Sequence, residues 1–474
     1  MKSYLADIDL DVFRRYSGLS LPRHVSYPMP TAWSDIEPNE AAAMLRESRE
    51  RTPANDLSLY FHIPFCEQLC RFCACTKVIQ KHSSPHASQR TEAYVDALER
   101  EIHQVADTLG GDECVRHIHF GGGTPTYLAA DQLERFFVVI RERFTLAEDA
   151  EIAIEIDPRV VDAESLRGLR EMGFNRVSLG VQDFDLTVQQ HVKRVQPFEL
   201  VRDTVNICRD LGFASINFDL IYGLPYQTPE TVRDTIEKTI ALSPDRIAYY
   251  HYAQIPDKIA TQRGLDNTKL PDSESKLEMF LLGVDMFEAA GFTFVGLDHF
   301  AKADEPLAVA QRNGTLQRNF QGMTTGGGLD LIGMGASSIS HLGEIGFLQN
   351  ARENEFYAAL VNRGISPVQR GKRLTEDDFI RQTLLSRLYC YGDIRPALLE
   401  ERFGISFADY FARELDIMKD MQIDGLVTLD DDGGVTATRP LGRVLIRNIA
   451  GVFDAYLDPE AYRVGDKRCF SASA

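Results

Sequence analysis

The sequence has almost no tryptophan and no long apolar run: Trp33 is the single tryptophan among 474 residues. Its longest apolar stretches, such as RFFVVIR and MFLLGVDMF, are short and flanked by charge. A bilayer-spanning helix needs about 20 apolar residues, so we expect no membrane partner. The opening MKSYLADIDLDVFRRY mixes acidic residues into its apolar positions, which is atypical of a signal peptide. These features predict a cytoplasmic protein.

Basic residues are also in short supply, with 51 lysines and arginines against 70 aspartates and glutamates and a net charge of -19. Nonspecific affinity for nucleic acids and anionic membranes comes mainly from basic side chains that neutralise phosphates. The charge therefore argues against both partners, and an anionic substrate would need a local basic lining. No feature of the sequence indicates symmetry, so a monomer is expected.

The cysteines are too unevenly spread for a disulfide framework. Four of the eight are crowded at Cys66, Cys70, Cys73 and Cys75, whereas the others are isolated at positions 114, 208, 390 and 469. Disulfide scaffolds are typical of small secreted domains, and crowded thiols in a reducing compartment point to metal binding.

Short β-branched and aromatic runs alternate with segments of helical period from Leu57 to about Phe300. This rhythm predicts parallel β/α units. Strands are expected at residues 57–63, 115–120, 151–156, 176–181, 215–222 and 246–252. The fold class is therefore α/β, with a partial (β/α)6 TIM-like barrel over residues 53–345. A full eight-unit barrel is the alternative, in which FTFVGLDHF at 292–300 adds a further strand.

The two ends of the chain have different patterns. Residues 1–52 carry few periodic signals and are expected to form an N-terminal arm. Residues 346–474 begin with helical patterns, and LVTLDDDGGVTAT, with its Asp-Gly-Gly turn, predicts a β-hairpin. Helices followed by a hairpin suggest a small, mostly helical, winged-helix-like C-terminal domain. Because the chain is acidic, a lid or packing role is expected rather than DNA binding.

The crowded cysteines have a spacing that suits an iron-sulfur cluster. Cys66, Cys70 and Cys73 follow the first strand as C-x3-C-x2-C, so one loop can wrap three thiolates around a cluster. Three thiolates on a 4Fe-4S cubane leave one iron open, and the amino and carboxylate groups of S-adenosylmethionine can chelate it. The alternative is a four-thiolate zinc site, but such sites usually pair two C-x2-C knuckles and the sequence has no second one. The role of Cys75 stays open.

Several segments carry a family resemblance. YFHIPFCEQLCRFCACTKV, residues 60–78, resembles the cluster motif of radical S-adenosylmethionine enzymes. HFGGGTPTYL, EIDPR, GVQDF, NFDLIYGLPYQT, GLDHFA, RNFQG and LIGMGASSIS follow in the order found in the oxygen-independent coproporphyrinogen III oxidases. The resemblance runs from about Leu57 to Ser340, and VLIRNIAGVFDAYL extends it toward the C-terminus.

This resemblance implies a partial barrel, a 4Fe-4S cluster on Cys66, Cys70 and Cys73, and two molecules of S-adenosylmethionine. By position it assigns to the molecule on the cluster Tyr60, Gly122 and Glu155. It assigns to the second molecule Phe72, Gly123, Thr124, Gln182, Arg194, Asp219, Ala253 and Ile339.

The residues themselves support part of that assignment. Gly121 to Gly123 follow a strand, where missing side chains let the backbone approach a polar ligand, although a tight turn would explain them equally well. Glu155, Gln182 and Asp219 lie near the C-terminal ends of predicted strands, where barrel enzymes place their chemistry.

Pattern alone gives a different interpretation of four other residues. It would make Arg194 a solvated surface charge. It would make Tyr60 and Phe72 core residues, and His62 a satisfied buried histidine without a catalytic role.

The resemblance also implies an activity, the oxidative decarboxylation of two propionates of coproporphyrinogen III to vinyl groups. The product would be protoporphyrinogen IX, in anaerobic haem biosynthesis. A reductase or flavodoxin-type donor and an unidentified acceptor would exchange electrons with the enzyme. Candidates for balancing the substrate carboxylates are Arg14, Arg15, Arg23, Arg312 and Arg318.

Two other functions share the cluster motif, those of a haem-chaperone relative and of a radical tetrapyrrole methyltransferase. The chaperone relatives lack a counterpart of Cys75 and carry a Tyr-Trp pair beyond the barrel. This sequence has Cys75, and Trp33 precedes the barrel. Met323 in QGMTTGG, Gly326-Gly327 and the RHVSYP run depart from the oxidase pattern on the expected substrate side.

Overall fold

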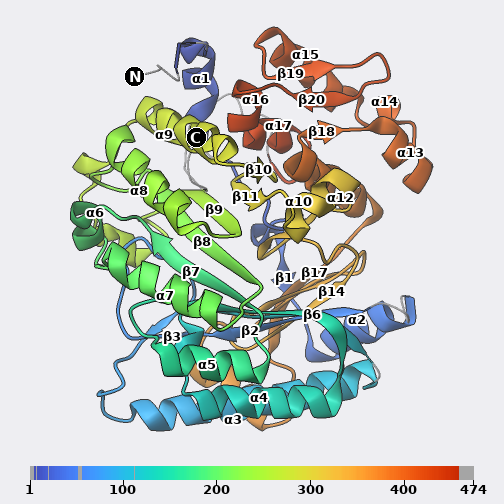
Figure 1. The fold of residues 1–474 in the computed structure, drawn as a ribbon. Helices are drawn as coiled ribbons and strands as arrows, with labels where there is room; N and C mark the ends of the chain where they lie inside the picture. Colours follow the sequence, from blue (N-terminus) through green and yellow to red (C-terminus); the bar gives the residue numbers. More distant parts are fainter. Residues whose placement is uncertain (1–4, 7, 20, 52–55, 112, 458–474) are drawn as a thin grey trace.

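The computed structural model describes residues 5–6, 8–19, 21–51, 56–111 and 113–457 (Figure 1). Its centre is one mixed 13-stranded sheet. In spatial order the strands are β1 (Ser34–Asp35), β17 (Val368–Arg373), β16 (Gly346–Asn350), β15 (Ile339–Leu342), β14 (Asp330–Met334), β2 (Leu57–Ile63), β5 (Cys114–Gly122), β6 (Thr145–Ile156), β7 (Arg176–Gln182), β8 (Ser215–Tyr222), β9 (Arg246–His251), β11 (His299–Lys302) and β10 (Phe292–Phe294).

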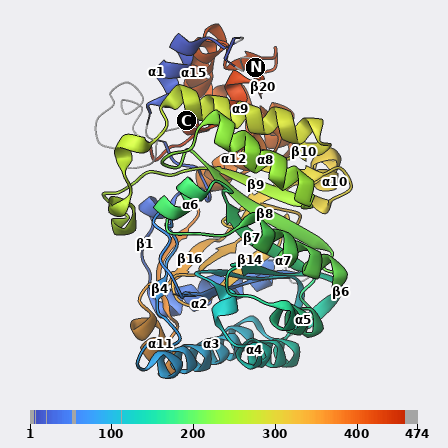
Figure 2. The ribbon, with the colours of Figure 1, turned by 60° about the vertical axis from the view of Figure 1, so that its left-hand side comes forward.

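The six predicted parallel strands are confirmed. Strands β2, β5, β6, β7, β8 and β9 are parallel neighbours in that order. The intervening helices pack on the outer face of the sheet (Figures 1 and 2). They are α3 (Ala87–Leu109), α4 (Ala130–Arg143), α5 (Ala163–Met172), α6 (Leu186–His191), α7 (Phe198–Asp210), α8 (Pro229–Leu242) and α9 (Ser273–Ala289).

The eight-unit barrel is wrong. β14 adds a parallel strand beside β2, but beyond it β15, β16 and β17 are antiparallel. At the opposite edge, the predicted extra strand at 292–300 forms β10 and the start of β11, and β11 pairs antiparallel with β9. Because β1 and β10 are free edges of the described sheet, the barrel stays open.

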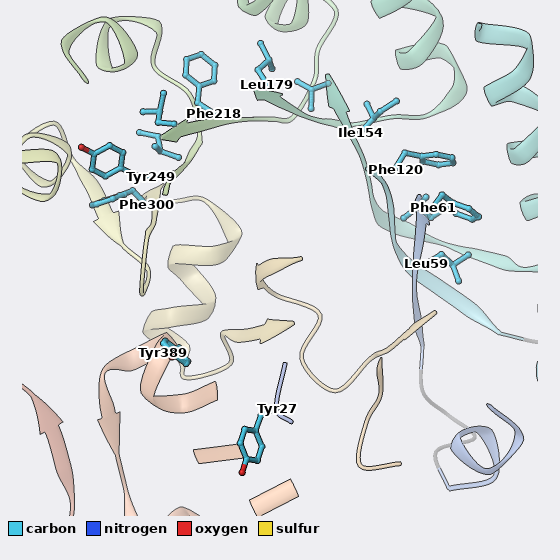
Figure 3. Close-up of a cluster of buried hydrophobic side chains, with 14 of the residues drawn as sticks. Tyr27, Leu59, Phe61, Phe120, Ile154, Leu179, Phe218, Tyr249, Phe300 and Tyr389 are labelled. Carbon is cyan, nitrogen blue, oxygen red and sulfur yellow. The ribbon is translucent and has the colours of Figure 1, made fainter. Parts of the chain in front are cut away.

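The parallel strands bury apolar side chains on the face that meets the helices. Leu59, Phe61, Phe120, Ile154 and Phe218 are fully buried there (Figure 3). The rings of Phe61 and Phe120 stack with centroids 4.7 Å apart, and Phe174 meets Phe120 edge-on at 5.5 Å. Burying each such side chain stabilises the fold by about 1.5–3 kcal/mol, so this layer is the main core.

The N-terminal arm contains more regular structure than its pattern predicts. Helix α1 (Leu10–Ser17) begins where Asp9 accepts hydrogen bonds from the Asp11 and Val12 amides, and α2 spans Pro38–Arg51. The buried residues of α2 are Ala41, Met44, Leu45 and Ser48, a helical i, i+3, i+4, i+7 stripe that the sequence interpretation missed. Strand β1 then joins the arm to β17.

The C-terminal region confirms the predicted helices and hairpin. β19 (Val427–Leu429) and β20 (Val435–Ala437) form the hairpin, and β18 (Asp393–Ile394) pairs with β20. The helices around them are α12 (Glu376–Tyr391), α13 (Pro396–Phe403), α14 (Phe407–Tyr410), α15 (Ala412–Ile423), α16 (Leu441–Val444) and α17 (Ile446–Val452). The central sheet continues past the expected boundary at residue 345 through β16 and β17. The three-part division of the chain stays a prediction.

The remaining elements connect these layers. They are β3 (Phe65–Cys66), β4 (Val78–Ile79), α10 (Pro306–Asn313), β12 (Gln317–Asn319), β13 (Gly322–Thr324), α11 (Asn354–Asn362) and 3-10 turns at Pro30–Ala32, Pro125–Tyr127, Ala260–Gly264 and Asn267–Lys269. Of the helices that the structure describes, none is both long and apolar enough to cross a membrane. The isolated Cys469 lies outside the described residues.

Candidate active site

The cysteine motif forms a closed loop directly after β2. Strands β3 and β4 pair in parallel, with Cys66 opposite Ile79, and so hold the two ends of the loop together. Cys66 and Cys70 are buried and Cys73 is half-buried. The Cys73 amide donates to the Cys70 carbonyl oxygen over 3.2 Å, and Lys77 Nζ donates to the Cys73 carbonyl oxygen over 3.0 Å. One short segment therefore presents all three thiols.

The surroundings of these sulfurs supply hydrogen-bond donors and positive charge. The Thr124 hydroxyl donates to Cys66 Sγ over 3.4 Å, while Arg194 and Arg159 donate to Cys70 Sγ over 3.6 and 3.8 Å. Burial raises the pKa of Cys66 to about 11, and the Thr124 hydrogen bond opposes that shift. Donors aimed at sulfur favour the thiolate, which is the form that binds metal.

This donor set fits a 4Fe-4S cluster. Among the residues that the structure describes, no three His, Cys, Asp or Glu side chains are arranged to hold one metal ion. A cubane does not require such an arrangement, because each thiolate binds a different iron. Three thiols on one loop, with cationic donors around Cys70, suit a cluster with three protein ligands.

Three glycines after β5 bring the backbone against this loop. A Cβ atom at Gly121 would lie 2.6 Å from Glu155 Oε1, and one at Gly123 would lie 2.7 Å from the Pro64 carbonyl group. Gly122 has a φ of +116°, which L side chains rarely adopt, and a Cβ there would contact the His62 ring. Backbone conformation at Gly122 and backbone contact at Gly123 therefore require glycine, whereas a Cβ atom at Gly121 would displace the Glu155 carboxylate.

Glu155, near the end of β6, faces the inside of the barrel. His119 Nε2 lies 3.3 Å from Glu155 Oε1, and the Gly122 amide donates to Oε2 over 3.1 Å. Burial raises the pKa of Glu155, but the hydrogen bond and charge of His119 and the Gly122 amide outweigh it and bring the pKa below its usual range. Glu155 is therefore an ionised carboxylate at neutral pH.

Asp219 on β8 is the second carboxyl group of this face. Asn217 Nδ2 donates to its Oδ1 over 2.9 Å, and Ser178 Oγ donates to its Oδ2 over 3.2 Å. Burial and the nearby charge of Glu155 raise the pKa of Asp219 to about 6. The two carboxyl groups thus have pKa values shifted in opposite directions, as is common at functional sites.

A cavity of about 450 Å³ opens between these groups. Of the residues that the resemblance assigns to S-adenosylmethionine, five line it: Tyr60, Gly122, Glu155, Asp219 and Ile339. Cys75, which is exposed, also lines it, and so does His62. His62 Nε2 lies 3.0 Å from the Thr76 carbonyl oxygen and its Nδ1 lies 3.1 Å from the Tyr60 hydroxyl, so it is a satisfied buried histidine as predicted.

The other named residues lie outside the lining of this cavity. Arg194 is buried, and the pattern-based interpretation as a surface charge is wrong. Its NH1 donates to Asp157 Oδ2 over 3.0 Å and its NH2 to the Gly180 carbonyl oxygen over 2.7 Å, so burial is compensated. Gln182, with a φ of +68°, is the last residue of β7, two residues after Gly180. Thr124 lines a separate cavity with Cys66, and Gly123 is the residue before Thr124.

Phe72 and Ala253 are brought together by one side chain. Gln262 Nε2 donates to the carbonyl oxygens of both residues, over 3.2 and 2.9 Å. Phe72 is half-buried and packs against an apolar cluster that contains Val192 and Tyr252, so it lies at the margin of the core that pattern alone predicted for it. Tyr60 is also half-buried and borders the cavity, so it is not a core residue.

Sequence reasoning missed other polar residues on the inner face. His119, Ser178, Asn217 and Tyr250 all line the cavity. A signal for them exists in the period-2 alternation of the strands, since SINFDLIY places Asn217 and Asp219 on one face and Phe218 on the other.

The five candidate arginines have different surroundings. Arg14 pairs with Glu274 and Arg15 with Asp424, both over short surface contacts, and exposed Arg312 donates to the Ala303 carbonyl oxygen. Arg23 donates to the His251 carbonyl oxygen, and Arg318 projects from β12 into a separate large cavity. Of the five, only Arg23 and Arg318 point away from the exposed surface.

Of the departures from the oxidase pattern, Met323 lines the active-site cavity, with its sulfur 3.8 Å from Cys390 Sγ. A Cβ atom at Gly326 or Gly327 would lie 2.8 Å or less from the His117 ring or the Gln317 side chain, so a larger residue at either position requires that side chain to move.

Comparison with known proteins gives a consistent result. The Radical SAM superfamily profile matches residues 60–239. Oxygen-independent coproporphyrinogen III oxidase of Salmonella typhimurium is 43% identical over 97% of this chain and 98% of its own, and that of Escherichia coli K12 is 42% identical over 96% and 97%. The solved structure of coproporphyrinogen III oxidase from Escherichia coli, described as a radical SAM enzyme, superposes with a TM-score of 0.86 at 41% identity, over 95% of this chain and 99% of that one. The chain belongs to the oxygen-independent coproporphyrinogen III oxidase family.

Proposed function

We propose that this chain is a radical S-adenosylmethionine enzyme that converts coproporphyrinogen III to protoporphyrinogen IX by oxidative decarboxylation of two propionates. The observation that carries the proposal is the polar inner face of the barrel, whose cavity is bordered by Ala74, Cys75 and Thr76 of the loop that carries the three thiols. Membership of the oxidase family, at about 43% identity along nearly the whole chain, supplies the substrate class.

The cluster would be held by Cys66, Cys70 and Cys73. A cluster and S-adenosylmethionine bound there would supply the radical chemistry for taking a hydrogen from the β-carbon of a propionate, with loss of carbon dioxide and one electron. The electron that reduces the cluster would come from a reductase or flavodoxin-type donor. A separate acceptor would take the electron that is released when carbon dioxide leaves. A monomer suffices for this reaction.

Tyr60, Gly122 and Glu155 would bind the S-adenosylmethionine on the cluster. Glu155 offers an ionised carboxylate to a cationic or hydroxyl group, and Gly122 leaves room for close backbone approach. The residues proposed for a second molecule are Phe72, Gly123, Thr124, Gln182, Arg194, Asp219, Ala253 and Ile339. Of these, Asp219 and Ile339 line the same cavity as Glu155, and Arg194 lies beside Cys70.

The chain's own contribution to the chemistry is position and exclusion of water. Hydrogen abstraction needs no general acid or base, so the inner face has to hold the propionate carbon beside the radical and shield both. The glycines after β5 and the satisfied His62 keep the walls fixed around the cavity.

Anaerobic reconstitution with coproporphyrinogen III, S-adenosylmethionine and a reductant tests this proposal. The expected products are carbon dioxide and a macrocycle with two vinyl groups. A mass gain of one methyl group would instead establish a methyltransferase. Tight stoichiometric haem binding without decarboxylation would instead establish a haem chaperone.

A further inference from the structure

A second, larger cavity adjoins the active site. It has a volume of about 640 Å³ and lies between the hairpin β12–β13 and helix α12. Asn319, Phe320 and Thr324 of the hairpin line both this cavity and the active-site cavity, as do Ser58 and Leu331. The two spaces therefore meet on either side of one short hairpin, and a large ligand could extend from one into the other.

The lining of this cavity is basic, although the chain as a whole carries a charge of -19. Five arginines line it, against the two carboxyl groups of Asp330 and Glu344: Arg51, Arg318, Arg387, Arg395 and Arg402. Glu344 is paired with Arg51 over 2.9 Å, and Arg387 and Arg395 share Asp393. We name it the arginine cavity.

Two of its arginines form no ion pair among the described residues, although the charge of Arg318 helps to lower the pKa of Asp298. Arg318 Nε and NH1 are buried and make no hydrogen bond, while the guanidinium lies 5.4 Å from the centroid of the Tyr389 ring. Arg402 stacks on Phe379 and Phe403, at 4.8 and 5.3 Å. Arg318 is half-buried and Arg402 is exposed. Buried guanidinium nitrogens without a hydrogen bond are costly, and a carboxylate bound bidentately to Arg318 offsets that cost.

Apolar side chains form the cavity walls between the arginines. Phe320, Phe379 and Leu398 line the cavity together with Tyr27 and Tyr389, and the last two are drawn in Figure 3 on the arm and on α12. A volume of about 300–1,000 Å³ with apolar walls and a few charged groups is typical of small-molecule sites. This combination suits a large hydrophobic ring that carries several carboxylates.

We propose that the arginine cavity binds the propionates of the macrocycle that are not reacting, and that Arg318 is the carboxylate-binding residue at the passage to the active-site cavity. The inference rests on the proposed function for its ligand. Arg402 binds a second carboxylate at the other end of the cavity. Holding these groups orients the macrocycle so that one propionate at a time lies over the inner face.

Titration with coproporphyrin III, the oxidised and unreactive form of the macrocycle, tests the assignment by fluorescence quenching on anaerobic holoprotein. Arg318→Gln should weaken binding by about tenfold or more, because a charge-assisted bidentate contact is lost. Arg402→Gln should weaken it by about threefold, since this guanidinium is stacked nearer the outside. Arg318→Lys should restore part of the affinity, and Arg363→Gln, at an exposed arginine after α11 that lines neither cavity, should change nothing.

A comparison ligand separates binding from a merely structural role. The tetramethyl ester of coproporphyrin III has the same macrocycle without free carboxylates, so Arg318→Gln should lower the affinity for coproporphyrin III and leave that for the ester unchanged. Equal losses for both ligands, or unchanged affinity in both the Arg318 and Arg402 variants, would overturn the proposal.

The same samples distinguish this proposal from the proposed function. Cleavage of S-adenosylmethionine without substrate should proceed normally in Arg318→Gln. If the wild-type protein decarboxylates coproporphyrinogen III and the variants bind coproporphyrin III normally, the binding role of the arginine cavity is overturned and the proposed function stands. If the expected affinity pattern appears without any carbon dioxide release, the cavity stands and the proposed function fails.

Discussion

The two faces of the parallel strands carry opposite chemistry. Toward the helices, β2, β5 and β8 present Phe61, Phe120 and Phe218, all fully buried. Toward the inside of the open barrel, β6 and β8 present Glu155 and Asp219. Parallel strands that are covered on both sides are usually apolar throughout, so the polar face marks the part of the sheet that is used for binding. Stability and function are thus divided between alternate residues of the same strands.

The largest expected effect comes from replacing a cysteine at the active site, compared with replacing one in the apolar layer. Cys70→Ala should lower turnover by about a thousandfold or more, since a cluster ligand is lost. Cys208→Ala, on α7 in the apolar layer, should keep turnover and lose only about 1 kcal/mol of unfolding free energy. Visible absorbance, iron content and turnover of the two anaerobic proteins provide the check. A brown, active Cys70 variant would contradict the assignment.

A substitution in the apolar layer should lower the stability of the fold and leave binding unchanged. Phe120→Ala removes a fully buried ring that contacts Phe61 and Phe174, and it should cost about 3–5 kcal/mol of unfolding free energy. Urea denaturation of the apoprotein measures this loss. Protein that remains folded at low temperature should still bind S-adenosylmethionine with wild-type affinity. A loss of that affinity in folded protein would show that the two faces are not independent.

A single methyl group can test the inner face. Gly121→Ala would place a Cβ atom 2.6 Å from Glu155 Oε1, so the carboxylate has to move, and S-adenosylmethionine affinity should fall by about tenfold. Gly168→Ala on α5 meets nothing within 4 Å and should leave affinity unchanged while stabilising the helix by up to about 1 kcal/mol. Equilibrium binding of S-adenosylmethionine to both variants decides the matter. Equal affinities would remove Glu155 from the binding site.

The smallest expected effect is a pH dependence from Asp219. Its pKa is raised to about 6 in the folded apoprotein, so folding favours the protonated form. The stability that it contributes is present below its unfolded pKa of about 4 and is lost as the pH rises through 6. Asp219→Asn should therefore gain about 1–2 kcal/mol relative to wild type between pH 4 and pH 6.5. Urea midpoints across that range measure the gain, and parallel curves would contradict it.

Much of the contrast between the apolar and polar faces of the strands could be predicted from the sequence. The six parallel strands follow from local alternation of β-branched runs and helical segments, and the cysteine loop follows from its spacing. The burial of Arg194 does not follow, because it depends on Asp157 and Gly180, which are distant along the chain and meet it only in the folded barrel. The antiparallel extension through β15 to β17 pairs strands that follow one another along the chain, but its place in the sheet depends on the long-range pairing of β14 with β2. The inner polar face was recoverable from the period of the strands, as Asn217 and Asp219 show.

The central claim is that three thiols of one loop hold a cluster with an iron open to S-adenosylmethionine. Its most direct measurement is electron paramagnetic resonance of anaerobically reconstituted, reduced protein, before and after addition of S-adenosylmethionine. A reduced-cluster signal that changes shape when S-adenosylmethionine binds is the predicted result. The absence of a signal, or a signal that S-adenosylmethionine leaves unaltered, would contradict the account.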